Sequence, residues 1–592
     1  MNKDSETKIC QNCKNEFEIT QDDFNFFKKL NVSPPTWCPR CRFIRKLTYI
    51  NERSLYKRNC ANCQENIISM FHPDVSIPVW CLKCHISDTW DARDYAKKYD
   101  FSRNFFEQFK DLKYSVPHRA LDRNERNGPG CEYSNYCFTS KNIYLSYGIH
   151  ASEDIKYSKN IFDQSKNCLD SLTTKKTDRC YEVVQTSESF DSSFLVESEQ
   201  CISSHFLFNC ANCTNCCLSS NIRNKSNVFR NKQLSKEEYQ QAISNLKLNT
   251  YIGQTKTKEE FKEMVLKSIH RYAHIKNCMN STGDFIENAK NCSRCYGLVG
   301  AENLKNCFFA MASNTQDSQD LIFTGRGDES YESTYAGRGI NKVVLSACCG
   351  SGSCNLFYCD SCRACSDCFG CVGLSKKQYC IFNKQYSKEE YFELIEKIKK
   401  HMNEMIYIDK IGREYGFGEF FPTELSPFAY NETVAYEENL LSKDEIITFG
   451  YKWRERELRS YIPTVETKDL PDSINDVNNS ICDEIIGCIN KGKVETQCTL
   501  AFRILPDELT FYRQMKLPIP RFCPNCRYYD RKKWVNTFNF YLRECMCELS
   551  NHGHEKNPRH GGVKCQVEFE TMYAPERPEI IYCKDCYQKE FL

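Results

Sequence analysis

The feature that most constrains this chain is a set of cysteines near its N-terminus that occur as four CxxC pairs. The pairs are Cys10 with Cys13, Cys38 with Cys41, Cys60 with Cys63, and Cys81 with Cys84. A CxxC turn places two sulfurs on one side of a tight loop, and two such turns make the tetrahedral thiolate cage that Zn²⁺ prefers. Eight thiolates fill two closed sites and leave no coordination position for water. The pattern therefore predicts two structural zinc sites of the zinc-ribbon or treble-clef kind.

The C-terminal region repeats this pattern. At an offset of 485 residues, Cys13, Cys38, Cys41 and Cys60 fall on Cys498, Cys523, Cys526 and Cys545. Past an insertion of 17 residues the offset is 502, and Cys63, Cys81 and Cys84 fall on Cys565, Cys583 and Cys586. Cys10 alone lacks a direct counterpart, so we expect Cys488 to replace it, with Cys482 as the weaker candidate. The sequence thus predicts about four zinc ions per chain.

Two questions about these sites stay open at the level of sequence. The four pairs of each unit can be used sequentially or cross-braced, and we expect the sequential arrangement. The C-terminal insertion carries Cys547, His552, His554 and His560, which could bind a further ion. Histidines in a loop that contains glycine and proline are more often solvated, so we expect no fifth site there.

Composition bounds the class of protein. A chain of 592 residues is several times the usual domain size. Its net charge of +2 gives no global field that would attract a polyanion. The polar N-terminus has no signal-peptide core, and no stretch reaches the roughly 18 apolar residues of a membrane span. With 40 cysteines, we expect a non-secreted protein of a reducing intracellular compartment, where thiols bind metal; virion association stays open.

Residues 131–383 have a different texture, with short β-prone segments punctuated by Asn, Ser and Cys. Asn tolerates left-handed turns, so a repeated corner residue between short strands predicts a β-solenoid. This block is also duplicated, because at an offset of 152 the residues Cys210, Cys213 and Cys216 fall on Cys362, Cys365 and Cys368. Each half ends in a predicted capping helix, which begins at the capping boxes Ser235/Glu238 and Ser387/Glu390.

Five cysteines in the second half are spaced three residues apart, and they admit three interpretations. They are Cys359, Cys362, Cys365, Cys368 and Cys371. An iron-sulfur cluster would want a different final spacing and a proline after the last cysteine. Additional zinc is the second interpretation. The third, which we favour, is a stack of buried thiols, because free Cys behaves as a small hydrophobic residue.

The expected architecture is an α+β multidomain chain in which terminal zinc modules flank a duplicated Cys/Asn-rich β-solenoid with capping helices. The expected units are 1–120 (N-terminal zinc domain), 131–276 and 277–406 (solenoid halves), 407–476 (connector) and 477–592 (C-terminal zinc domain).

Basic and aromatic residues lie together beside the second knuckle of each zinc unit. The N-terminal set includes Arg40, Arg42, Arg45, Lys46, Arg53 and Lys57 with Phe43 and Tyr56, and the C-terminal set Arg521, Arg527, Arg531 and Lys532 with Tyr528 and Trp534. Such faces can hold phosphates and stack bases, but they also serve protein contacts. A nucleic-acid or a protein partner therefore stays open, and no small-molecule substrate is identified. We expect a non-enzymatic scaffold, because P-loop and HExxH motifs are absent; an enzyme of unknown reaction is the alternative.

With these motifs set out, the chain resembles a family of uncharacterised cysteine-rich proteins that pair terminal zinc ribbons with a central Asn/Cys-rich repeat. The resemblance rests on residues 382–391, 426–434 and 573–583 and covers nearly the whole chain. Some members carry the label CaiB/BaiF, a CoA-transferase family, but no residues here support that activity. The chain departs from the family pattern between Cys488 and Cys498, where the knuckle is interrupted.

Overall fold

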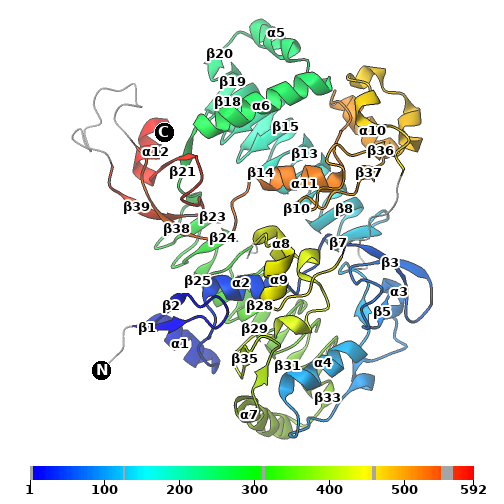
Figure 1. Ribbon diagram of the computed structural model, residues 1–592. Coiled ribbons are helices and arrows are strands. Elements are labelled where there is room, and N and C mark those ends of the chain that lie inside the picture. Colours follow the sequence, from blue (N-terminus) through cyan, green and yellow to red (C-terminus); the bar gives the residue numbers. More distant parts are fainter. Residues whose placement is uncertain (1–4, 125–126, 310–313, 456–461, 548–564, 592) are drawn as a thin grey trace.

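The computed structural model describes residues 5–124, 127–309, 314–455, 462–547 and 565–591, and it has a mixed α/β fold with one large sheet (Figure 1). The N-terminal region contains β1 (Ser5–Ile9), β2 (Glu16–Thr20), α1 (Gln21–Leu30), α2 (Pro39–Leu47), β3 (Tyr56–Asn59), β4 (Asn66–Ser69), β5 (Val79–Trp80), α3 (Leu82–His85), η1 (Ala92–Tyr95), α4 (Phe105–Ser115) and β6 (His118–Arg119). β1 pairs with β2 and β3 with β4 as antiparallel hairpins.

The large sheet has fourteen strands, β7 to β20. They are β7 (Tyr133–Phe138), β8 (Lys141–His150), β9 (Glu153–Lys156), β10 (Lys159–Phe162), β11 (Lys166–Leu169), β12 (Leu172–Lys175), β13 (Asp178–Tyr181), β14 (Val184–Ser187), β15 (Phe190–Val196), β16 (Glu199–Ile202), β17 (His205–Phe208), β18 (Ala211–Ser220), β19 (Arg223–Phe229) and β20 (Lys232–Gln233). The helices α5 (Lys236–Leu246) and α6 (Tyr251–Lys267) follow, and α5 lies on β19.

A second strand-rich region begins after β21 (Ile269–Arg271) and forms sheets of three and nine strands. Its strands are β22 (Ile275–Lys276), β23 (Gly283–Glu287), β24 (Cys295–Val299), β25 (Glu302–Lys305), β26 (Gln316–Ile322), β27 (Gly327–Asp328), β28 (Tyr331–Thr334), β29 (Ile340–Val344), β30 (Cys354–Phe357), β31 (Ser366–Phe369), β32 (Gln378–Ile381) and β33 (Lys384–Gln385). α7 (Lys388–Glu404) then packs on β32.

The remaining elements are short. They are β34 (Tyr407–Ile408), β35 (Glu414–Tyr415), η2 (Thr423–Leu425), η3 (Tyr430–Glu432), α8 (Val434–Glu438), α9 (Lys443–Thr448), η4 (Thr467–Asp469), η5 (Ile474–Asp476), η6 (Asn479–Asp483), β36 (Ile486–Gly487), β37 (Ala501–Phe502), α10 (Pro506–Gln514), α11 (Pro524–Lys532), β38 (Tyr541–Glu544), β39 (Glu568–Thr571), β40 (Ile580–Tyr582) and α12 (Lys584–Phe591). No helix among the described residues is long and apolar enough to cross a membrane.

The strands of the large sheet pair in parallel with partners twelve residues further along the chain. Cys168 lies opposite Cys180, and Cys201 lies opposite Cys213. The backbone turns into the left-handed region at every third residue, as at Asp170, Thr173, Lys176 and Arg179. We call each twelve-residue unit of this repeat a pass. A pass therefore has four bends, and each short segment between two bends directs one side chain inward.

The inward side chains are small, and their polar groups find partners inside. Cys168, Ser171, Thr174, Thr177 and Cys180 are all at most 2% exposed. Serine hydroxyls join one pass to the next, because the backbone N–H groups of Cys201 and Ser204 donate to Ser189 Oγ and Ser192 Oγ at 3.1 Å. These bonds satisfy polar groups that burial would otherwise penalise. They explain why Ser and Cys dominate this region.

Asparagine occupies many of the bends. Asn209, Asn212, Asn221 and Asn224 all have positive φ. Asn209 Nδ2 donates to Asn221 Oδ1 and Asn212 Nδ2 donates to Asn224 Oδ1, each at 2.7 Å and across twelve residues. Asn tolerates the left-handed conformation better than most residues, and its amide can bond to the copy above it. The prediction that Asn marks the corners of the repeat rests on this chemistry.

Both predicted capping boxes are confirmed. Ser235 Oγ accepts from the backbone N–H of Glu238, whose carboxylate accepts in return from the Ser235 N–H. Ser387 and Glu390 make the same pair at the start of α7. The matching caps place a helix at the end of each strand-rich region.

His270 in β21 makes stability depend on pH. Burial lowers its pKa from 6.5 to about 4. The unfolded chain takes up this proton below pH 6.5 and the folded chain only near pH 4, so the stabilising contribution is complete above pH 6.5 and is lost as the pH falls between those values. The loss amounts to about 3 kcal/mol. We expect the urea midpoint to fall less between pH 7.5 and 5 in His270→Gln than in the wild type; equal falls would contradict this.

Candidate metal centres

The structure brings sixteen of the predicted cysteines together as four groups of four. The groups are Cys10, Cys13, Cys38 and Cys41; Cys60, Cys63, Cys81 and Cys84; Cys488, Cys498, Cys523 and Cys526; and Cys545, Cys565, Cys583 and Cys586. Within each group all sulfur atoms lie within 4.8 Å of one another. The grouping follows the order of the chain, so the geometry is sequential and not cross-braced. Four sulfurs at this spacing can surround one tetrahedral metal ion.

Each group is assembled from a hairpin and the start of a helix. In the first group Cys10 and Cys13 lie between β1 and β2, while Cys38 precedes α2 and Cys41 lies within it. Pro39 occupies the first turn of α2, where its missing N–H costs no hydrogen bond. The backbone N–H of Cys38 donates to Cys10 Sγ at 3.2 Å, and Cys13 Sγ lies 3.8 Å from Cys38 Sγ.

The same backbone-to-sulfur bond recurs in the other three groups. Cys81 N–H donates to Cys60 Sγ at 3.3 Å, and Cys583 N–H donates to Cys545 Sγ at 3.2 Å. In the third group Cys523 N–H donates to Cys488 Sγ at 3.3 Å. Cys488 therefore occupies the position that Cys10 has in the first group, whereas Cys482 lies outside every group.

In each group one cysteine has a lowered pKa and so favours the thiolate, the form that binds metal, while neighbouring thiols in the same group have raised pKa values. Hydrogen bonds from the Cys38 and Cys41 side chains hold the pKa of Cys10 far below its ordinary value. Burial raises the pKa of Cys60, but backbone N–H groups of Cys63 and Cys81 outweigh it and lower this pKa to about 7. A hydrogen bond from Cys545 lowers the pKa of Cys583 to about 5.

The five cysteines spaced three apart are not among the four groups. Cys359, Cys362, Cys365 and Cys368 are the inward residues of one twelve-residue pass, and Cys371 lies above Cys359. Burial raises the pKa values of Cys359 and Cys362 well above their ordinary value, so both stay neutral thiols. Cys362 Sγ donates to the Cys371 carbonyl at 3.5 Å. The spacing of three therefore reflects the repeat and not a ligand pattern.

Most of the C-terminal insertion considered for a fifth metal ion lies outside the described residues. His552, His554 and His560 lie in the part of the chain that is not described. Cys547 is buried beside the fourth group but is not one of its four members.

Part of the basic face beside the second knuckle of the N-terminal unit is buried inside the molecule. Arg42 pairs with Asp320 at 2.8 Å, and Arg45 pairs with Glu332 at 3.0 Å and Glu419 at 2.8 Å. All these side chains are at most 7% exposed. These two arginines are therefore not available to a partner of either kind, because internal carboxylates already neutralise them.

The C-terminal unit is held in the same way. Arg527 and Arg531 each lie 2.7 Å from a different oxygen of Asp170, and all three side chains are nearly inaccessible. Figure 1 shows α11, in orange, across the cyan strands of the large sheet, and α2, in blue, beside the green strands β25 and β28.

The two interfaces are copies of each other. Arg42 and Arg527 correspond at the offset of 485, and their partners Asp320 and Asp170 lie 150 residues apart. A ring contact is duplicated as well, because Phe27 meets Tyr331 at 5.3 Å between ring centroids and the equivalent Tyr512 meets Tyr181 at 5.9 Å.

The second cysteine group of each terminal unit lies beside the start of one strand-rich region, and the helix of its first group lies on the other. Val79 in β5 pairs with His118 in β6, just before the first strand-rich region. Ile581 in β40 pairs with His270 in β21, just before the second. In each terminal unit, the helix of the first cysteine group (α2 or α11) thus lies on one strand-rich region. The second cysteine group lies beside the start of the other strand-rich region.

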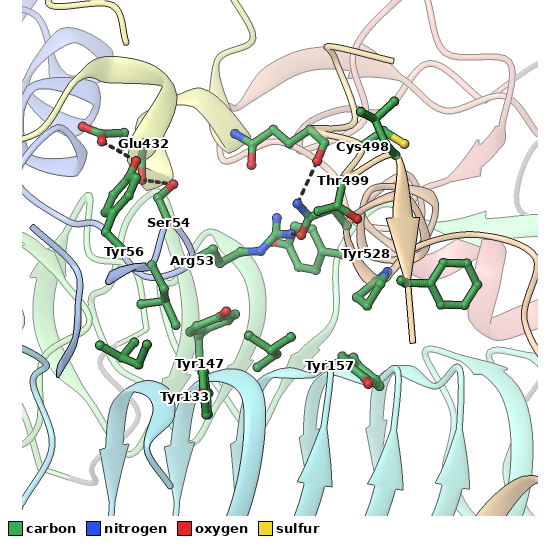
Figure 2. A pocket seen from close by; sticks show the side chains of 18 of the residues that line it. Arg53, Ser54, Tyr56, Tyr133, Tyr147, Tyr157, Glu432, Cys498, Thr499 and Tyr528 are labelled. Atoms are coloured by element: carbon green, nitrogen blue, oxygen red, sulfur yellow. Dashed lines mark hydrogen bonds between the residues drawn. The ribbon is translucent and has the colours of Figure 1, made fainter. Parts of the chain in front are cut away.

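A large cavity lies where these parts meet, and sequence reasoning did not find it. Its volume is about 680 Å³, and its walls come from residues 53–57, from strands β7 and β8 with the bend after β9, from the connector and from the segment around Cys498 of the third cysteine group. Figure 2 shows Tyr133, Tyr147 and Tyr157 rising from the strands on one side, with Arg53 and Tyr528 opposite. The connector contributes Arg454 and Tyr436 to this cavity. The sequence signal that could have revealed this cavity is the recurrence of tyrosines on successive passes.

Comparison with known proteins gives no family. No protein-family model matches the chain, and no curated protein matches it. One solved structure that aligns is described as an acetyltransferase from Desulfovibrio desulfuricans G20. It is 12% identical, the alignment covers 40% of this chain and 59% of that one, and the TM-score is 0.09. A likeness this weak carries no argument about fold or activity.

Proposed function

We propose that this protein is a zinc-stabilised, non-enzymatic scaffold with four structural metal centres. The observation that carries the proposal is the set of four closed groups of four sulfurs. All-cysteine tetrahedral sites are typical of structural Zn²⁺, since soft thiolates select it over hard cations and fill every coordination position. No open position is left for a substrate or a water molecule at such a centre.

The architecture we propose is two zinc-ribbon units around a duplicated β-solenoid. Parallel pairing at twelve residues, with four bends in each pass, supports a solenoid with four short sides. The units are those expected from the sequence: 1–120, 131–276, 277–406, the connector 407–476, and 477–592.

A reducing compartment fits this chemistry. Cysteines inside the strand-rich regions, such as Cys168 and Cys359, are buried and form no disulfide. An oxidising environment would drive close thiols toward disulfides, whereas a reducing one leaves them for metal.

In the proposed scaffold, each end of the chain contacts both halves of the solenoid. Each zinc unit bridges the two solenoid halves through an arginine-carboxylate contact and a strand pairing. The metal fixes the helix that carries the arginine, because two of its ligands flank the start of that helix. Metal binding thereby couples the two ends of the chain to the middle.

Elemental analysis of protein purified without added metal tests the proposal. We expect about four zinc ions per chain. Cys488→Ser should remove about one ion, because it takes a ligand from the third group. Cys482→Ser is the matched control and should keep all four. Zinc near zero in the wild type, or equal loss in both variants, would overturn the assignment.

A further inference from the structure

We propose that the cavity between the N-terminal zinc unit, the first solenoid half and the C-terminal zinc unit binds a nucleotide unit, either free or within a single strand. Its volume of about 680 Å³ lies within the range of small-ligand sites. The proposal goes beyond the scaffold role and does not depend on it.

The aromatic wall comes from the first strands of the large sheet. Tyr133, Tyr144 and Tyr157 follow one another on successive passes, with centroid distances of 5.6 Å and 5.8 Å. Tyr133 is 40% exposed, so its ring is accessible to a ligand. Tyrosine faces stack on bases of any sequence.

The opposite wall holds a second planar group. The Arg53 guanidinium lies 3.6 Å from the centre of the Tyr528 ring, and it also donates to Asn525 Oδ1 at 2.8 Å. Glu437 lies 3.5 Å from Arg53 and accepts a hydrogen bond from the Tyr528 hydroxyl at 2.6 Å. These partners fix the two planes, so this wall is ordered before any ligand arrives.

The charges at the cavity favour an anion. Arg454 is paired with Glu432 at 2.6 Å, and Glu455 is paired with Lys443. Lys57 and Arg503 are exposed, and neither has a carboxylate within 4 Å among the described residues. Two cations at the edge of an aromatic cavity suit a phosphate attached to a base.

The internal duplication provides a comparison within the same molecule. A second cavity of about 490 Å³ lies at the equivalent junction and is lined by Glu18, Phe43, Ser293, Asn306 and Phe538. These five occupy the positions of Arg503, Tyr528, Tyr144, Tyr157 and Arg53 in the first cavity.

The second cavity therefore differs from the first at each of these five positions. The tyrosines are replaced by Ser293 and Asn306, and the cation of Arg503 is replaced by the carboxylate of Glu18. Phe538 packs on Phe43 and Phe308, with centroid distances of 6.0 Å and 5.5 Å, where the first cavity has Arg53 on Tyr528. Lys57 corresponds to Leu542. Two copies of one junction have diverged, and only the first combines a wall of tyrosines with the exposed cations Lys57 and Arg503.

The test is a titration of the zinc-loaded full chain with a fluorescein-labelled twelve-nucleotide oligoadenylate at low salt, followed by anisotropy. AMP and orthophosphate are then added separately as competitors. We expect the oligonucleotide to bind and AMP to displace it, while orthophosphate at the same concentration does not. Binding of the oligonucleotide without displacement by AMP would identify the single strand as the source of the nucleotide.

The variants exchange residues for those that the second cavity already contains, so they are compatible with the fold. Tyr144→Ser should weaken binding about tenfold through the lost stacking. The double variant Lys57→Leu with Arg503→Glu should weaken it at least about tenfold and flatten its salt dependence. Glu18→Ala in the second cavity is the matched control and should change nothing. Absence of binding by both AMP and the oligonucleotide, or equal affinity in all variants, would overturn the proposal.

Discussion

Removal of the bound metal is expected to unfold the two ends of the chain and to expose sixteen thiols to solution reagents. The four groups of four sulfurs join hairpins to the first turns of short helices. Structural zinc contributes about 10–16 kcal/mol to the folding of small zinc domains, so its loss cannot be offset locally. The measurement is a thiol titration during chelation, together with the thermal midpoint, which should fall by tens of degrees.

The interior cysteines are the internal control for this experiment. Cys168, Cys359 and Cys371 are fully buried within the strand-rich regions and belong to none of the four groups. They should react only in a later phase, once the solenoid itself opens. If strong chelation left the thermal midpoint unchanged and the sixteen sulfurs unreactive, the metal centres would be misassigned.

The metal groups could be predicted from sequence because their information is local and repeated. A CxxC turn fixes two sulfurs within four residues, and the internal copy supplied an independent check that led to Cys488. The capping boxes at Ser235 and Ser387 were predictable for the same reason, since each is complete within four residues.

The role of the basic residues could not be predicted, because it depends on contacts far apart in the chain. Arg42 meets a carboxylate 278 residues away, and Arg531 meets one 361 residues away. A run of arginines beside aromatic residues looks the same in sequence whether it faces a phosphate or a buried aspartate. The cavity was missed on similar grounds, since its walls come from four separate parts of the chain.

The contacts of each terminal unit with both strand-rich regions suggest a physical origin for the duplication. The order along the chain is cysteine unit, strand-rich region, strand-rich region, cysteine unit, yet each cysteine unit contacts both strand-rich regions. Two equivalent interfaces with the same arginine and aspartate would also form if two shorter chains associated symmetrically. The present chain holds both interfaces within one molecule, which leaves each copy of the junction free to diverge.

Substitution of Asp170 by Asn should be the most damaging single change outside the metal ligands. Its two oxygens neutralise Arg527 and Arg531 at 2.7 Å each, in a place where none of the three side chains is more than 4% exposed. Removing the carboxylate leaves the buried Arg531 without a counter-charge and Arg527 with only Glu508, 3.7 Å away, which costs about 3–5 kcal/mol. Chemical unfolding followed by tryptophan fluorescence should show the loss at the C-terminal unit, where Trp534 lies against the same core.

Two further variants show whether the effect comes from burial. Asp191→Asn removes the partner of Arg179 from a pair whose side chains are 38% and 41% exposed, and it should cost less than about 1 kcal/mol. Asp320→Asn removes the equivalent buried partner of Arg42 and should resemble Asp170→Asn in size, but with the loss at the N-terminal unit. If Asp170→Asn proved as mild as Asp191→Asn, the arginine-carboxylate contacts would not hold the zinc units to the solenoid, and the coupling between the ends of the chain would need another origin.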